Sequence, residues 1–180
     1  MRKISATLAA CALGAAILVG LAPASASGPA YLRVASFTAT SHNKAAARLS
    51  VRTDAAIPRH PNAFIRSNLV VGFAWVDAAT GRAFVTTIHP AIGRDSRQNP
   101  RAWHAHTVTL SGGATPPNDF CLVSIDSSPT AGISIHGATM RVNVRKSKLP
   151  AAPQTLTLAT GFTLQADAAC ASGLAVLVST

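Results

Sequence analysis

The sequence predicts an all-β domain, an antiparallel β-sandwich or a small barrel of about nine strands, behind an N-terminal signal peptide. Three observations support this prediction. Apolar and polar residues alternate in short runs along residues 27–180, no stretch there has an apolar stripe of helical period, and clusters of Gly and Pro separate the runs. Strands at this spacing, joined by Gly and Pro turns, are typical of sandwiches and small barrels.

The first 26 residues have the organisation of a secretory signal peptide. Arg2 and Lys3 carry positive charge, and residues 4–22 are uncharged and rich in Ala, Leu, Ile and Val. The Pro-Ala-Ser-Ala sequence of residues 23–26 then provides a helix breaker and the small residues that signal peptidase requires. We therefore expect cleavage after Ala26 and a secreted or extracytoplasmic protein.

Two alternatives remain for this N-terminal segment. It could be retained as a membrane anchor, because its apolar run is nearly long enough to span a bilayer, although the cleavage motif favours removal. It could also carry a lipid on Cys11, since residues 8–11 look like a lipobox, although the apolar run continues past this cysteine. The expectation is a single domain, residues 27–180, with no transmembrane segment after cleavage.

The first half of the domain shows alternation and one doubly apolar run. Leu49 and Val51 share one face of their run while Arg48 and Arg52 share the other. Residues 69–76 are apolar on both faces, as expected of a central strand. The expected strands in this half are residues 31–38, 47–52, 69–76 and 83–88.

The second half continues the pattern and contains a tight hairpin. A two-residue loop of His136 and Gly137 would pair Ile135 with Ala138, and would therefore pair Ile133 with Met140. The expected strands in this half are residues 103–110, 120–125, 133–135, 138–144, 155–166 and 173–179.

Two cysteines, Cys121 and Cys170, lie outside the signal peptide. In an oxidising compartment two cysteines in a small domain usually form a disulfide. Such a bond would close a loop of about 50 residues and stabilise the fold by roughly 4 kcal/mol in the chain-entropy model. The alternative is two separate buried thiols.

The chain is strongly basic, with 16 Lys and Arg residues against six acidic residues and a net charge of +10. A basic exported protein is attracted to anionic cell-wall or surface polymers. Three arginines in one loop, Arg94, Arg97 and Arg101, lie close in sequence to the indole of Trp103 and form a candidate anion-binding site. The alternative is a solvated loop with Trp103 in the core. No specific nucleic-acid-binding motif is present.

The strongest candidate for a chemical site is the sequence Trp103-His104-Ala105-His106. Residues two apart on a strand share a face, so the two histidines point the same way, with Cβ atoms about 7 Å apart. Two imidazoles at this spacing can bind Cu or Zn. His89 is the first choice as third ligand and Asp95 the second. The alternatives are that the two histidines lie on a solvated strand face, or that they form a half-buried pair that binds no metal.

An H-x-H strand in an exported sandwich with one disulfide is similar to copper–zinc superoxide dismutase. The similarity covers residues 103–106, and it would imply a redox role for bound copper. The Gly-rich metal loop of that family and the Gly-Asp sequence after the second histidine are missing here.

Three function classes follow from these patterns. The sequence favours a secreted, non-catalytic binding domain whose basic surface contacts anionic envelope components. The alternative is an exported Cu- or Zn-binding protein that uses the H-x-H strand. A hydrolase ranks third, because the G-x-S-x-G, H-E-x-x-H and P-loop motifs are absent.

Overall fold

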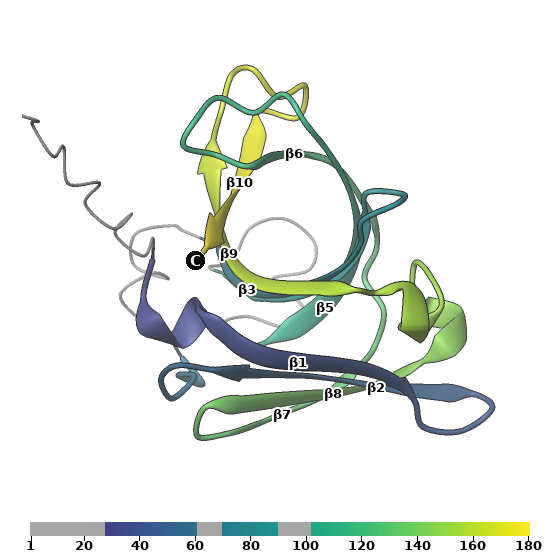
Figure 1. The fold of residues 1–180 in the computed structure, drawn as a ribbon. Helices are drawn as coiled ribbons and strands as arrows, with labels where there is room; N and C mark the ends of the chain where they lie inside the picture. Colours follow the sequence, from purple (N-terminus) through teal and green to yellow (C-terminus); the bar gives the residue numbers. More distant parts are fainter. Residues whose placement is uncertain (1–27, 61–69, 90–101) are drawn as a thin grey trace, which may run out of the picture.

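Ten strands form two layers in the computed structural model, which describes residues 28–60, 70–89 and 102–180. One layer is a four-stranded sheet in the order β1-β2-β8-β7, and the other is a closed six-stranded barrel in the order β10-β6-β5-β4-β3-β9. Figure 1 shows the barrel nearly end-on with the sheet against one side of it. The all-β prediction is therefore confirmed.

All neighbouring strands in the four-stranded sheet are antiparallel. Its strands are β1 (Val34–Ser41), β2 (Ala46–Thr53), β7 (Gly132–His136) and β8 (Thr139–Arg145). Leu49 and Val51 of β2 are fully buried while Arg48 and Arg52 are exposed, as the alternation predicted. One face of the sheet therefore packs on the barrel and the other faces solvent.

The barrel is also antiparallel throughout. Its strands are β3 (Val70–Asp77), β4 (Arg82–Ile88), β5 (His104–Ser111), β6 (Phe120–Ser127), β9 (Leu158–Ala166) and β10 (Leu174–Ser179).

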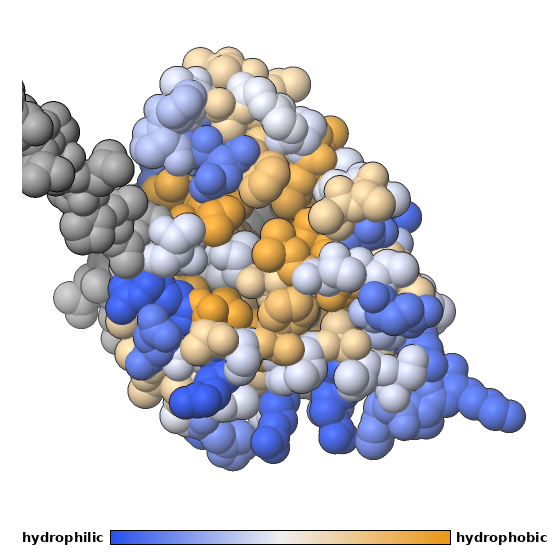
Figure 2. Space-filling view, viewed as in Figure 1, coloured by the Kyte–Doolittle hydropathy of each residue, from blue (hydrophilic) through white to orange (hydrophobic). Residues whose placement is uncertain are grey.

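The two faces of β3 belong to two different apolar cores. Phe73 and Trp75 join the core between the barrel and the sheet, whereas Ala74 and the partly buried Val76 belong to the core inside the barrel. This arrangement explains why β3 is apolar on both faces. In Figure 2, apolar side chains surround a hollow at the centre of the barrel.

Two predicted strands begin later than expected because 3-10 helices precede them. The helix Ala30–Leu32 comes before β1, and Pro153–Thr155 comes before β9. Leu32 is fully buried, and Gly161 makes room for it, since a Cβ at residue 161 would collide with the Leu32 carbonyl group. A third 3-10 helix, Lys146–Lys148, follows β8.

The predicted register of the β7–β8 hairpin is wrong by two residues. Ile135 pairs with Met140 instead of Ala138, and the turn consists of Gly137 and Ala138. Gly137 has a φ of 56°, a conformation that glycine adopts without the strain of a side chain. A shift of two residues keeps the same side chains on each face, so the apolar pattern alone could not distinguish the two registers.

The barrel closes at a short seam between β6 and β10, whose pairing consists of Ala175 with Cys121 and Val176 with Phe120. The predicted disulfide between Cys121 and Cys170 is present at this seam, with 5.3 Å between the two Cα atoms. It joins β6 to the turn between β9 and β10. The Ser172 hydroxyl also donates to the Leu122 carbonyl across the seam.

Some predictions fall outside the described residues. These are the signal peptide with its cleavage after Ala26, the lipobox at Cys11, and the loop that carries the three arginines and Asp95. Within the described part, no helix has the length and apolar character needed to cross a membrane.

Candidate metal centre

Three histidines converge at one end of the barrel interior. His104 and His106 are the first and third residues of β5, and their partners on β4 are Thr87 and Val85. His89 directly follows β4, two residues after Thr87, so it lies on the same face. The antiparallel pairing therefore places all three imidazoles next to one another. The structure brings together the three histidines that the sequence singled out.

The three rings are close enough to share one ion. One nitrogen from each ring can be chosen so that the three atoms lie within 4.8 Å of one another. The Nε2 atoms of His89 and His104 are 2.9 Å apart, and the ring centres of His104 and His106 are 4.9 Å apart. Zn–N bonds of 2.0–2.1 Å in a tetrahedron place ligand nitrogens about 3.3 Å apart. The His89–His104 distance of 2.9 Å is near this spacing, and the upper bound of 4.8 Å for the three nitrogens exceeds it by about 1.5 Å.

A backbone carbonyl fixes the proton on His104. The Nδ1 atom lies 2.8 Å from the carbonyl oxygen of Ala102, and a carbonyl only accepts, so Nδ1 donates. In the neutral form of this ring Nε2 carries the lone pair, so a proton between the Nε2 atoms of His104 and His89 would come from His89. A metal ion would take the place of this proton, and a carbonyl partner on the far nitrogen is typical of histidine ligands.

A hydroxyl group holds the ring of His106. The Oγ of Ser128, in the loop after β6, lies 3.0 Å from Nδ1 of His106. Because Nδ1 of His106 faces this hydroxyl, Nε2 is the atom through which His106 would bind a metal. No sequence pattern indicates Ser128, because its position depends on the pairing of β5 with β6, which is shifted by irregularities at two places.

The donor set consists of neutral nitrogen ligands in a largely buried site. His89 is 9 % exposed, His104 8 % and His106 4 %. No carboxylate joins this cluster among the described residues. The three imidazoles themselves add no negative charge to a bound divalent ion.

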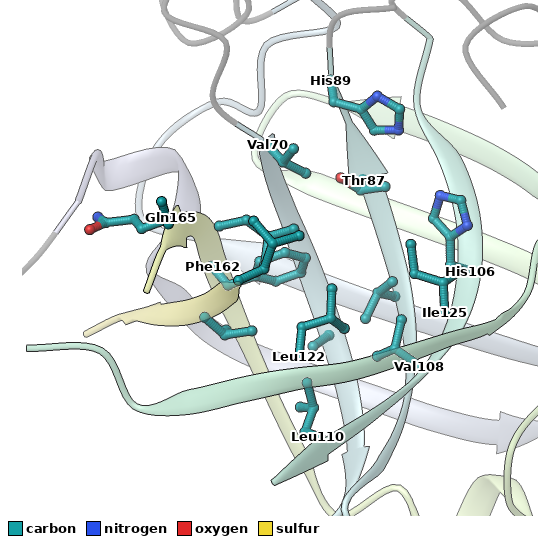
Figure 3. Close-up of a pocket in the computed structure, with 16 residues that line it drawn as sticks. Val70, Thr87, His89, His106, Val108, Leu110, Leu122, Ile125, Phe162 and Gln165 are labelled. Carbon is teal, nitrogen blue, oxygen red and sulfur yellow. The ribbon is translucent and has the colours of Figure 1, made fainter. Parts of the chain in front are cut away.

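The histidine cluster adjoins an apolar cavity of about 450 Å³ inside the barrel, and both His89 and His106 line it. Figure 3 shows these two histidines at one end of the cavity, above the aliphatic side chains of Val108, Leu110 and Leu122. The alternation of apolar and polar residues does not predict this cavity. The signal for it lies in the small side chains, such as Ala74, at positions that face the barrel interior.

Trp103 packs in the core between the layers. Its ring stacks on Phe73, with 5.7 Å between the ring centres, and its indole nitrogen donates to the Pro58 carbonyl. These contacts place the indole in the core, which is the alternative to a role in anion binding. Arg94, Arg97 and Arg101 lie outside the described residues, so their role stays a prediction.

No protein-family model, curated protein or solved structure matches the chain. The interpretation of the site therefore rests on its geometry and chemistry.

Proposed function

We propose that this protein binds one divalent transition metal ion, Zn²⁺ or Cu²⁺, through His89, His104 and His106. The observation that supports the proposal is the approach of one nitrogen from each ring to within 4.8 Å of the others. Imidazole suits both metals, and three protein ligands on zinc leave a fourth position for water or another ligand.

Calorimetric titration of the metal-free protein, cleaved after Ala26, with Zn²⁺ and Cu²⁺ tests the proposal. We expect one site per chain. The double variant His104→Ala/His106→Ala should lose it, because a single imidazole cannot hold the ion tightly. The matched control is His42→Ala/His136→Ala, which removes two exposed histidines elsewhere and should bind as the unmodified protein does.

Circular dichroism of both variants checks that the fold is retained. Absence of binding tighter than about 10 μM, equivalent to roughly 7 kcal/mol, would contradict the proposal. Binding that persists in the His104→Ala/His106→Ala variant would also contradict it.

A second candidate function is supported by the outer face of the four-stranded sheet. Four exposed arginines, Arg48 and Arg52 of β2 and Arg141 and Arg145 of β8, lie on these two paired strands. Among the described residues Arg33 pairs with Asp54, and none of the four arginines has an acidic partner there. In Figure 2, hydrophilic side chains project from the side where this sheet lies. We propose that this face binds anionic cell-wall or surface polymers.

Elution from immobilised heparin, used as a sulfated polymer, tests this second function. The variant Arg48→Ser/Arg141→Ser should elute at lower salt, because it removes two adjacent charges from the face. The control Arg82→Ser/Lys148→Ser removes two exposed charges elsewhere and should shift elution less. Equal shifts for the two variants would show that net charge alone governs retention.

Both functions belong to an exported protein in this proposal. The mass of the intact protein recovered from the medium should correspond to a chain that begins at Ser27. A mass that includes the apolar segment, or a lipid on Cys11, would contradict this location.

A further inference from the structure

The barrel interior contains a cavity that the proposed metal site does not explain. It has a volume of about 450 Å³, and twelve of its sixteen lining residues are apolar. The polar ones are Thr87, His89, His106 and Gln165, and no Asp, Glu, Lys or Arg lines it among the described residues. Protein interiors are close-packed, and cavities of roughly 300–1,000 Å³ with apolar walls are typical of small-molecule sites.

The cavity can be reached from solvent near the seam of the barrel. Ile125 on β6 and Leu174 on β10 both line the cavity, yet they are 56 % and 38 % exposed. The pairing of these two strands spans two residue pairs, which involve Cys121 and Phe120 on β6, so it does not extend to Ile125. An apolar chain can therefore enter beside Ile125 and Leu174 without unfolding a complete strand pair.

The histidine end of the cavity selects the polar group of a ligand. His89 and His106 belong both to the cavity wall and to the metal cluster. Because three imidazoles add no negative charge, a divalent ion among them favours an anionic oxygen ligand at its open position. After cleavage removes Arg2 and Lys3, 14 of the 16 Lys and Arg residues remain against six acidic residues, and this excess of positive charge also attracts an anionic ligand.

We propose that the barrel binds a single-chain carboxylate of the fatty-acid class, with the hydrocarbon chain in the cavity and the carboxylate at the histidine end. The position of the carboxylate rests on the proposed metal function, whereas the binding of the chain rests on the cavity alone. One end of the ligand is therefore held by the ion and the rest by apolar contacts.

Titrations with dodecanoate and with dodecanol, below the concentrations at which they aggregate, test the proposal in zinc-loaded and zinc-free protein. Both probes should bind with one molecule per chain. Zinc should strengthen dodecanoate binding about tenfold or more, a difference of at least roughly 1.4 kcal/mol, and leave dodecanol binding unchanged.

Substitution in the cavity wall shows where the probes bind. Val176 lines the cavity on β10, a strand that carries none of the three histidines, so Val176→Phe should abolish binding of both probes and leave zinc affinity unchanged. Val123→Phe is the matched control, because Val123 is 51 % exposed on β6 and is not part of the cavity wall. If Val176→Phe does not fold, Leu110→Trp at the partly exposed end of β5 serves the same purpose.

The outcomes separate the two proposals. Zinc binding without binding of either probe would overturn the cavity inference and leave the metal function standing. A second outcome is a protein that does not bind zinc but binds both probes, with Val176→Phe blocking that binding. This result would support the site for the hydrocarbon chain and would overturn both the metal function and the position of the carboxylate. Binding that Val176→Phe and Leu110→Trp leave unchanged would overturn the cavity inference.

Discussion

At the scale of single residues, the orientation of His106 depends on the hydroxyl of Ser128, 3.0 Å from its Nδ1 atom. Hydrogen bonds of this kind orient metal ligands, and their loss typically costs 10–100-fold in affinity. We expect Ser128→Ala to weaken zinc binding about tenfold. Competition titration against a chromophoric chelator measures the change.

The neighbouring serine provides a matched control for this prediction. Ser127 bonds the Thr107 hydroxyl at 2.7 Å and makes no hydrogen bond to a histidine among the described contacts. Ser127→Ala should therefore leave zinc affinity unchanged. Equal losses in the two variants would argue against a positioning role for Ser128.

Gly72 is a second residue at which a single atom matters, because the Cβ of any other side chain would collide with its neighbours. A Cβ there would lie 2.7 Å from the ring of Phe162 and closer still to the Thr86 carbonyl oxygen. Backbone cannot move aside as a flexible side chain can, so Gly72→Ala should lower the free energy of unfolding by about 1–3 kcal/mol. Urea denaturation measures this value.

Gly112→Ala is the control, because nothing lies within 4 Å of the position its Cβ would take. Its effect should stay within roughly 0.5 kcal/mol, as for an ordinary surface substitution. A Gly72→Ala variant as stable as the Gly112→Ala variant would contradict the expected crowding of β3 against β4 and β9.

At the scale of elements, Asp167 ties the loop before β6 to the turn between β9 and β10. Its carboxylate accepts from the backbone N–H of Thr115 at 2.7 Å, from the Ala169 N–H, and from the side chains of Asn118 and Thr115. These hydrogen bonds lower the Asp167 pKa from 3.8 to about 2. The Thr115 and Ala169 N–H groups contribute most, the Asn118 and Thr115 side chains add to them, and together they outweigh desolvation.

The sign of this pKa shift sets a pH dependence. Because the pKa is lower in the folded state, Asp167 contributes its full stabilisation above pH 3.8 and loses it as the pH falls toward 2. We expect Asp167→Asn to lower the Tm by a few degrees at pH 7, with the difference from the unmodified protein shrinking below pH 4. Calorimetry across this pH range checks the trend.

Asp126→Asn removes an exposed carboxylate on β6 and is the control for this series. Asp126→Asn should change the Tm less than Asp167→Asn does at neutral pH. A Tm difference for Asp167→Asn that is the same at pH 2 and pH 7 would contradict the assignment to an ionised carboxylate.

The seam of the barrel supplies a second prediction at this scale. The disulfide joins cysteines 49 positions apart, for which the chain-entropy model gives about 4 kcal/mol. The variant Cys121→Ser/Cys170→Ser should therefore unfold at a clearly lower urea concentration. Unmodified protein kept in reductant should behave like the variant, and unchanged midpoints in both cases would show that the seam is closed by its hydrogen bonds alone.

At the scale of the whole molecule, strand positions follow from local patterns but layer assignment does not. Residues 69–76 indicate a central strand because both faces are apolar, and β3 is indeed paired on both sides. Nothing in that run shows that one face looks into a barrel and the other toward a separate sheet. That difference arises from the pairing of β6 with β10, which are far apart in sequence.

Local patterns likewise predicted the three histidines of the candidate site, but not the residues and the cavity around them. Alternation placed His104 and His106 on one face, and the position of His89 at the end of the preceding strand made it the first choice as third ligand. The contact with Ser128 depends on the irregular pairing of β5 with β6, and the cavity beside the histidines arises only when the barrel closes. Closure brings together residues from several strands, and no local pattern records it.

The chain order through the two layers has a consequence for how the protein folds. The chain makes β1 and β2 of the sheet, then β3 to β6 of the barrel, returns for β7 and β8 of the sheet, and completes the barrel with β9 and β10. Neither layer is made by one continuous segment, so a fragment that stops after β6 lacks strands of both. Each layer therefore depends on the other for its stability, and heat should unfold both in one cooperative step.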